Sequence, residues 1–147
     1  MNSRSIDINK AKTYARKWQH ENSTHAKAFL IPANDLIACL EEMEVLINDG
    51  DGNYSLKNVA NSGVRAYMAI KRPEETPASP ETEKLLIVGT KVDREGKHRD
   101  IIEGEAPSRF NDENIETAFS KLKGSGVYDF TAPCPSECDE NSPLYNP

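Results

Sequence analysis

The sequence predicts an α+β fold: a small, mostly antiparallel sheet with helices packed on one face, and a proline-rich C-terminal tail docked onto it. Two amphipathic helix patterns come first and two strand patterns follow. A third helix and a last strand complete the order α-α-β-β-α-β. The length of 147 residues suits a single domain, in which residues 1–131 form the α+β core and residues 132–147 an ordered tail.

The first helix is predicted directly after Asp7, whose carboxylate can cap the free backbone amides. Apolar residues then recur at three- and four-residue steps, which is the spacing of one helical face. These residues are Ile8, Ala11, Tyr14, Ala15 and Trp18. Lysines and arginines fill the remaining positions, so the outer face is basic.

The second helix is predicted after Pro32, with Asn34 or Asp35 as its cap. Its apolar stripe is formed by Leu36, Leu40, Met43 and Ile47, and it ends at the turn cluster N-D-G-D-G-N. The exposed positions of this helix are acidic. Because the first helix is basic, we expect the two helices to pack side by side.

Two strands are predicted in the middle of the chain. In V-R-A-Y-M-A-I-K, the alternation of Val64, Ala66, Met68 and Ile70 with other residues has the period of a strand. The run K-L-L-I-V-G-T-K-V at residues 84–92 is short and rich in β-branched residues, as in a central strand. The proline-broken acidic connector at residues 72–83 predicts an antiparallel pair with a long tip.

The third helix is predicted with Asn111 or Asp112 as its cap and Gly124 as its end. Its apolar face consists of Ile115, Ala118, Phe119 and Leu122. The run V-Y-D-F-T at residues 127–131 predicts a last strand, after which the proline-rich tail has no period.

Composition excludes some classes of partner. The formal net charge of −6 argues against nucleic acid and against anionic membranes, because both need a surplus of basic residues. The N-terminal residues lack the apolar run of a secretory signal, so a cytoplasmic location is expected. In that compartment Cys39, Cys134 and Cys138 are expected to be thiols.

The tail carries the candidate ligands of a zinc site, which His20, His25 or His98 could complete. The motif C-P-S-E-C fits one half of a zinc site through Cys134 and Cys138, and Asp139 could add a carboxylate. No second cysteine pair completes the site, so the sequence predicts buried thiols and no cofactor. A redox pair is disfavoured, because the spacing is not C-x-x-C and the adjacent acids disfavour a thiolate.

Other patterns have simpler explanations. Asp49, Asp51 and Asn53 match the first, third and fifth positions of a calcium loop, but Tyr54 and Ala60 replace its essential glycine and glutamate. A turn is therefore predicted there. The three histidines are expected to be solvated, and Cys39 is expected to be a core residue. They are His20, His25 and His98.

Several segments together carry a resemblance. They are Trp18, I-P-A-N-D-L, R-A-Y-M-A-I, K-L-L-I-V-G and above all the tail Y-D-F-T-A-P-C-P-S-E-C-D-E-N-S-P-L. From about Trp18 to Leu144 the chain resembles an uncharacterised family of small bacterial proteins that end in this tail. The resemblance implies a bacterial origin and an ordered C-terminus, and it assigns no functional residue.

The function predicted from the sequence is that of a non-enzymatic cytoplasmic module that binds a protein partner or a small ligand. Tyr145 is the aromatic residue predicted to contact a partner, and Glu74 and Glu75 in the connector are further candidates. The alternative is a metal- or thiol-dependent enzyme centred on Cys134 and Cys138. Aromatic residues that could line a cleft are Trp18, Tyr67, Tyr128 and Phe130; the predicted tail anchors are Tyr128, Phe130, Leu144 and Tyr145.

Overall fold

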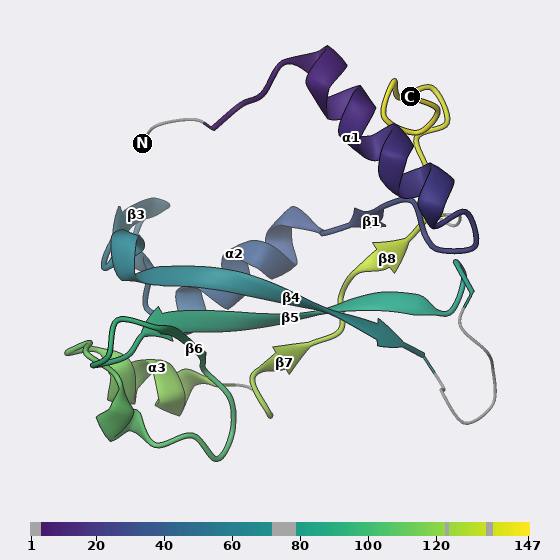
Figure 1. Cartoon of the computed structure of the whole chain (residues 1–147). Coiled ribbons are helices and arrows are strands. Elements are labelled where there is room, and N and C mark those ends of the chain that lie inside the picture. Colours follow the sequence, from purple (N-terminus) through teal and green to yellow (C-terminus); the bar gives the residue numbers. More distant parts are fainter. Residues whose placement is uncertain (1–3, 72–78, 123, 135–136) are drawn as a thin grey trace. The chain divides into compact units, whose positions relative to one another are not determined.

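A computed structural model describes residues 4–71, 79–122, 124–134 and 137–147 of the chain. Within these residues it has three α-helices, and its strands form small antiparallel sheets, so the predicted α+β class is confirmed (Figure 1). Contacts group the chain into two compact units. Unit 1 comprises residues 1–30, 69–84 and 132–147, and unit 2 comprises residues 31–68 and 85–131. That the 147 residues fold as one domain stays a prediction.

Unit 1 is built on helix α1 (Ile8–Glu21). The carboxylate of Asp7 accepts hydrogen bonds from the backbone amides of Asn9 and Lys10, at 2.9 and 3.2 Å, which confirms the predicted cap. After the helix, the chain forms the short strand β1 (Phe29–Leu30), which pairs antiparallel with β8 (Ala132–Pro133) at the start of the tail. This pairing places the segment after α1 beside the start of the tail.

Unit 2 contains most of the main sheet. Its strand order is β4 (Ser62–Ile70), β5 (Glu83–Val92) and β6 (His98–Asp100), and β7 (Val127–Tyr128) also pairs with β5. Strands β4 and β5 are therefore adjacent, as their sequence patterns predict. Short 3-10 helices, η1 (Val59–Asn61) and η2 (Pro107–Arg109), connect elements in the same unit.

The second helix is shorter than predicted. Helix α2 (Ala33–Glu42) is preceded by Pro32 without a side-chain cap, and it ends before Glu44, which adopts a left-handed backbone with φ of 57°. A left-handed residue cannot continue a right-handed helix, so the chain turns into strand β2 (Leu46–Gly50). The prediction that Ile47 belongs to the helical stripe is therefore wrong. The carboxylate of Glu44 pairs with Lys121 of the third helix.

The N-D-G-D-G-N cluster was predicted to end the second helix, but it is instead the turn of a hairpin. Strand β2 pairs antiparallel with β3 (Asn53–Leu56), and the turn between them places Gly50, Asp51 and Gly52 at positive φ. Glycine and aspartate tolerate this backbone region better than most residues. The calcium-like residues are therefore explained by a tight turn, as expected.

The core of unit 2 lies between α2, α3 (Ile115–Lys121) and the sheet. Its buried apolar residues are Cys39, Met43, Val45, Ile101, Phe110 and Ile115. Gly89 of β5 makes room for this packing, because a Cβ atom there would lie 2.6 Å from the side chain of Met43. The prediction of Cys39 as a core residue is confirmed. Burial and the nearby Glu42 carboxylate raise the pKa of its thiol to about 11.

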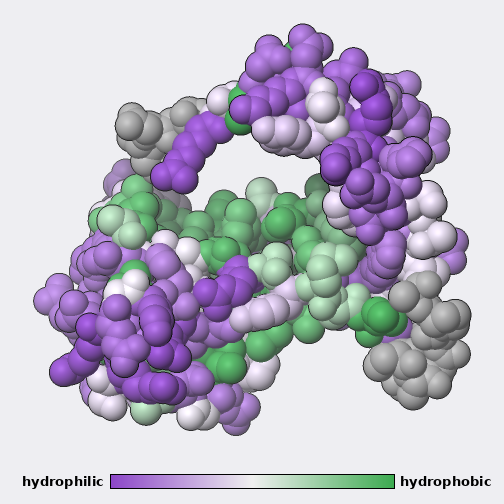
Figure 2. All heavy atoms as spheres, viewed as in Figure 1, coloured by the Kyte–Doolittle hydropathy of each residue, from purple (hydrophilic) through white to green (hydrophobic). Residues whose placement is uncertain are grey.

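Strand β4 shows the predicted alternation, but its apolar row is exposed. Val64 and Met68 are 39% and 61% exposed, and Figure 2 shows hydrophobic atoms gathered across the middle of the view, over this strand. On the alternate positions, Arg65 and Tyr67 both bond the Asp100 carboxylate at 2.5 Å. One face of β4 therefore carries apolar side chains and the other carries polar side chains, because successive side chains of a strand point to opposite faces.

A buried ion pair joins β5 to the start of α3. The Lys91 ammonium donates to the Asp112 carboxylate at 2.5 Å, and the two side chains are 1% and 5% exposed. Burial is the largest single influence on the pKa of Asp112 and would raise it, but the hydrogen bonds from Lys91 and the Asn114 amide together with the Lys91 charge outweigh burial, and the pKa is lowered. Asp112 also accepts the backbone N–H of Asn114 at 2.8 Å, but Asn114 is the residue directly before α3 and no side chain caps this helix, so the predicted cap at Asn111 or Asp112 is wrong.

The turn between β5 and β6 is organised by Asp93. Its carboxylate accepts the backbone amides of Lys97 and Glu95, at 2.9 and 2.8 Å, and the Arg99 guanidinium at 2.5 Å. These hydrogen bonds, that from Lys97 foremost, lower the pKa of Asp93 to about 2. The ionised carboxylate is therefore the form that stabilises the fold.

This pKa predicts a loss of stability in acid. A lowered folded-state pKa contributes stability above the ordinary pKa of 3.8, which is lost as pH falls through about 2. The Asp93→Asn variant should be less stable than the parent protein at pH 7, and the difference should shrink between pH 4 and pH 2. Urea unfolding across this range measures it, and a difference independent of pH would contradict the prediction.

Candidate functional site: a pocket between helix α1 and the C-terminal tail

A candidate feature for ligand binding lies within unit 1. A pocket of about 520 Å³ is bounded by α1, by β1 with the residues before it, and by the tail. Helix α1 contributes Ala15, Trp18 and Gln19, which the three- and four-residue steps of a helix place on one face. The other lining residues are Lys27, Ala28, Phe29, Leu30, Cys134, Glu137, Cys138, Asp139, Ser142, Leu144 and Tyr145.

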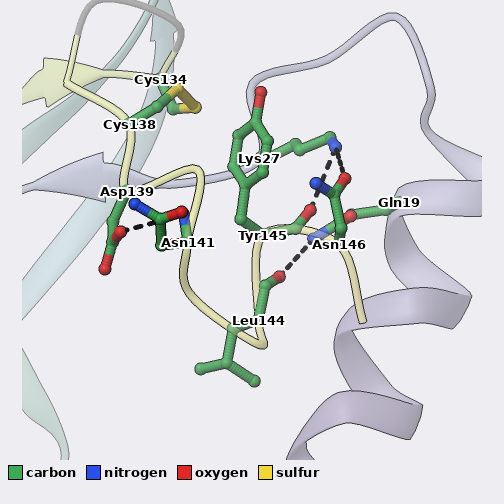
Figure 3. The surroundings of a disulfide bond; sticks show 9 residues. All are labelled: Gln19, Lys27, Cys134, Cys138, Asp139, Asn141, Leu144, Tyr145 and Asn146. Carbon is green, nitrogen blue, oxygen red and sulfur yellow. Dashed lines mark hydrogen bonds between the residues drawn. A yellow bond between two sulfur atoms is a disulfide. The ribbon is translucent and has the colours of Figure 1, made fainter.

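Polar contacts to main-chain atoms hold the tail against α1. The Gln19 side-chain amide donates to the carbonyl of Leu144 at 2.8 Å, and the Arg16 guanidinium donates to the carbonyl of Pro147 at 2.9 Å. Lys27 donates to the Tyr145 carbonyl at 3.1 Å, and its ammonium lies 4.2 Å from the centre of the Tyr145 ring. Figure 3 shows Lys27 beside this ring.

Two of the four predicted apolar anchors lie in the tail itself, and the other two belong to unit 2. Leu144 is 41% exposed, and it is held through its carbonyl. Tyr128 and Phe130 belong to unit 2, where their rings lie 6.0 Å apart and Tyr128 packs against the core of that unit. The Tyr128 hydroxyl donates to Glu42, and burial followed by this carboxylate raises its pKa. The Tyr145 ring contacts Lys27, and the contact of Tyr128 and Phe130 with the tail stays a prediction.

The tail cysteines form a disulfide, which corrects the expectation of two thiols. Cys134 is buried, and its backbone N–H donates to the carbonyl of Ala28 at 2.9 Å. Cys138 follows four residues later and leads into the rest of the tail. The pairing was missed because a cytoplasmic location was assumed for the whole chain.

The metal candidates do not converge in the part of the chain that the structure describes. There, no group of three or more histidine, cysteine, aspartate or glutamate side chains could hold an ion. The sulfurs of Cys134 and Cys138 are bonded to each other, and a zinc ligand would have to be a thiolate. The Asp139 carboxylate accepts the backbone N–H of Asn141 at 3.2 Å.

One basic and two acidic side chains line the pocket. Lys27 is engaged with Tyr145 and Asn146, whereas Glu137 and Asp139 form no ion pair with any described residue. Both acids are exposed at the margin of the pocket. A bound cation would therefore meet two carboxylates and one ammonium that is already engaged.

One contact near the pocket was not predicted. His25, expected to be solvated, contacts the buried carboxylate of Glu83 through Nδ1, and the other carboxylate oxygen accepts the Ala26 N–H at 2.7 Å. This contact fixes the turn between α1 and Lys27. Glu83 is the first residue of β5, and no local pattern links it to His25, 58 residues away.

The other sequence-predicted candidates are dispersed. Trp18 and Tyr145 line the pocket, and Tyr67 lies on β4 in unit 2. Glu74 and Glu75 lie outside the described residues, so their proposed contact with a partner stays a prediction.

Known proteins add no assignment. No family model, curated protein or solved structure matches the chain. Within the described ranges, none of the helices combines the length and apolar character needed to cross a membrane. The geometry of the pocket is therefore the main guide to what the protein binds.

Proposed function

We propose that this protein is a non-enzymatic binding module whose pocket between α1 and the tail takes a small organic ligand with an apolar body and a positively charged group. The pocket itself carries the proposal. Its volume of about 520 Å³ falls in the range of small-molecule sites, which is roughly 300–1,000 Å³.

The lining suits an apolar or aromatic body. Trp18, Phe29, Leu30 and Tyr145 surround the space, and burying an apolar group among such side chains yields roughly 25 cal/mol per Å². The Trp18 ring can also attract a ligand cation through its quadrupole, whereas the Tyr145 ring already contacts the ammonium of Lys27.

The unpaired acids favour a positive charge over a negative one. Glu137 and Asp139 have no cationic partner among the described residues, and the ammonium of Lys27 already contacts Tyr145. A ligand amine would satisfy these carboxylates, whereas a ligand carboxylate would be repelled. The expected difference in binding free energy between the amine and the carboxylate is modest, because exposed ion pairs contribute only about 0–1 kcal/mol each.

A matched set of probes tests this proposal. We expect 4-phenylbutylamine to bind more tightly than 4-phenylbutanol, and 4-phenylbutyrate to bind about tenfold more weakly than the amine. Trp18 is the only tryptophan in the chain and lines the pocket, so its fluorescence reports binding directly. Calorimetry provides an independent measure of affinity.

Two variants that replace an alanine of α1 with phenylalanine locate the site. Ala15→Phe should fill the pocket and weaken binding of the amine at least about tenfold, whereas Ala11→Phe, one turn earlier and outside the lining, should not. Both changes lower helix propensity equally. No saturable binding by any probe would contradict the proposal, as would equal effects of the two variants. Tighter binding of the butyrate would overturn the charge assignment.

Location and partners stay predictions. The Cys134–Cys138 disulfide would be unusual in the predicted cytoplasmic location, because disulfides in that compartment are usually transient or redox-sensing. A protein partner, the bacterial origin, and the exclusion of nucleic acid and membranes are likewise expectations from the sequence. A partner that binds in the pocket is expected to carry the same charge as the probe that binds most tightly.

A further inference from the structure

The disulfide joins two parts of the pocket wall. Cys134 is fixed to the side formed by β1, because it follows β8 and donates to the Ala28 carbonyl at 2.9 Å. Cys138 connects this fixed point to the side formed by Asp139, Leu144 and Tyr145, and both cysteines line the pocket (Figure 3). The covalent bond therefore sets the distance between two walls of one site.

We propose that the redox state of this disulfide controls the affinity of the pocket, and that reduction by a thiol weakens ligand binding. The inference depends on the proposed function, because it concerns the same pocket. It adds the means by which that pocket is regulated.

The remaining contacts hold the tail weakly once the bond is cut. The hydrogen bonds from Arg16, Gln19 and Lys27 to tail carbonyls are exposed, and exposed hydrogen bonds compete with water. The Glu137 N–H also bonds the Pro133 carbonyl at 3.1 Å. Without the covalent link, a ligand must order Cys138 and Asp139 when it binds, and that ordering lowers affinity.

The chemistry is ordinary thiol–disulfide exchange. One reductant thiolate attacks a sulfur of the Cys134–Cys138 bond and forms a mixed disulfide, while the departing cysteine thiolate takes up a proton. A second reductant thiol displaces the other cysteine. Two electrons and two protons pass to the protein, and the reductant leaves as its own disulfide.

Coupling between redox state and ligand must be reciprocal. If the oxidised protein binds the ligand more tightly, the bound ligand must stabilise the disulfide by the same factor. The pocket also gives the reductant access to Cys138, which is only half-buried. A bound ligand should therefore slow the reduction of the disulfide, and it should also shift the equilibrium toward the oxidised protein.

The test uses the full chain and 4-phenylbutylamine as the probe. Oxidised protein should show one thiol after denaturation, from Cys39, and reduced protein should show three. The affinity for the probe, read from Trp18 fluorescence, should fall about tenfold on reduction with dithiothreitol. Saturating probe should slow the appearance of the two new thiols.

The variant Cys134→Ser with Cys138→Ser provides the control, because its affinity should match that of reduced protein and should not respond to dithiothreitol. Equal affinities of oxidised and reduced protein would overturn the redox inference and leave the binding function intact. Absence of probe binding in both states would contradict the binding function itself. Three thiols in protein purified without reductant would show that the bond does not form, which also overturns the inference.

Discussion

Replacing Asp112 with alanine is expected to lower the free energy of unfolding by about 3–5 kcal/mol, because it leaves a buried ammonium without its partner. Lys91 is 1% exposed and its amine donates to Asp112 at 2.5 Å, so water cannot replace the lost carboxylate without opening the core. The same change removes the hydrogen bond to the Asn114 amide at the start of α3. Urea unfolding followed by circular dichroism measures the effect.

A double variant separates the charge from the packing. Lys91→Met with Asp112→Leu removes both charges and should recover much of the loss, since apolar residues can replace a buried ion pair. The surface pair of Lys17 and Glu21, with side chains 76% and 58% exposed, supplies the matched control. Glu21→Gln should change stability by less than about 0.5 kcal/mol. A cost below about 1 kcal/mol for Asp112→Ala would show that Lys91 is not buried in solution.

Deleting residues 132–147 is expected to abolish binding to the pocket and to lower the melting temperature. The tail supplies half of the residues that line the pocket, as well as β8, the disulfide and the contacts with α1. Titration of 4-phenylbutylamine against Trp18 fluorescence measures the loss of binding, and differential scanning calorimetry measures the loss of stability.

A shorter truncation provides the control. Removing only Asn146 and Pro147 leaves every lining residue in place, so binding should be retained. It also removes the contact between Arg16 and the Pro147 carbonyl, so a small loss of stability is acceptable. An unchanged melting temperature in the longer deletion would mean that the tail is a free appendage.

Local patterns in the sequence predicted the elements whose periodicity is unbroken. Helix α1, the Asp7 cap and strand β4 all follow from interactions within a few residues, and all three are confirmed, although no residue of the apolar stripe of α1 is buried. The third helix is also confirmed, although α3 is limited to Ile115–Lys121. The α+β class followed from these elements.

The sequence could not predict where a single residue breaks a pattern. Met43 and Ile47 keep a four-residue step, so the apolar spacing hides the left-handed backbone at Glu44 and the strand that follows. Glutamate rarely adopts that conformation without tertiary support, and its pairing with Lys121 depends on a helix more than 70 residues away. The side-by-side packing of the first two helices stays a prediction.

The pocket was only partly predictable for a similar reason. Trp18 and Tyr145 were recognised as aromatic candidates, but the residues that bring them together pair across more than 100 positions, as Gln19 does with Leu144. No periodicity encodes such a pairing. The C-P-S-E-C spacing, by contrast, did single out both cysteines, and the assumed compartment led to the wrong oxidation state.

The third cysteine has a consequence for oxidative maturation. Three cysteines allow three alternative crosslinks, yet Cys134 and Cys138 are separated by only four positions, so their short loop closes at the lowest entropic cost. Cys39 is buried and its thiol pKa is about 11, so it forms almost no nucleophilic thiolate at neutral pH. In the folded protein, Cys39 is therefore not expected to exchange with the Cys134–Cys138 bond.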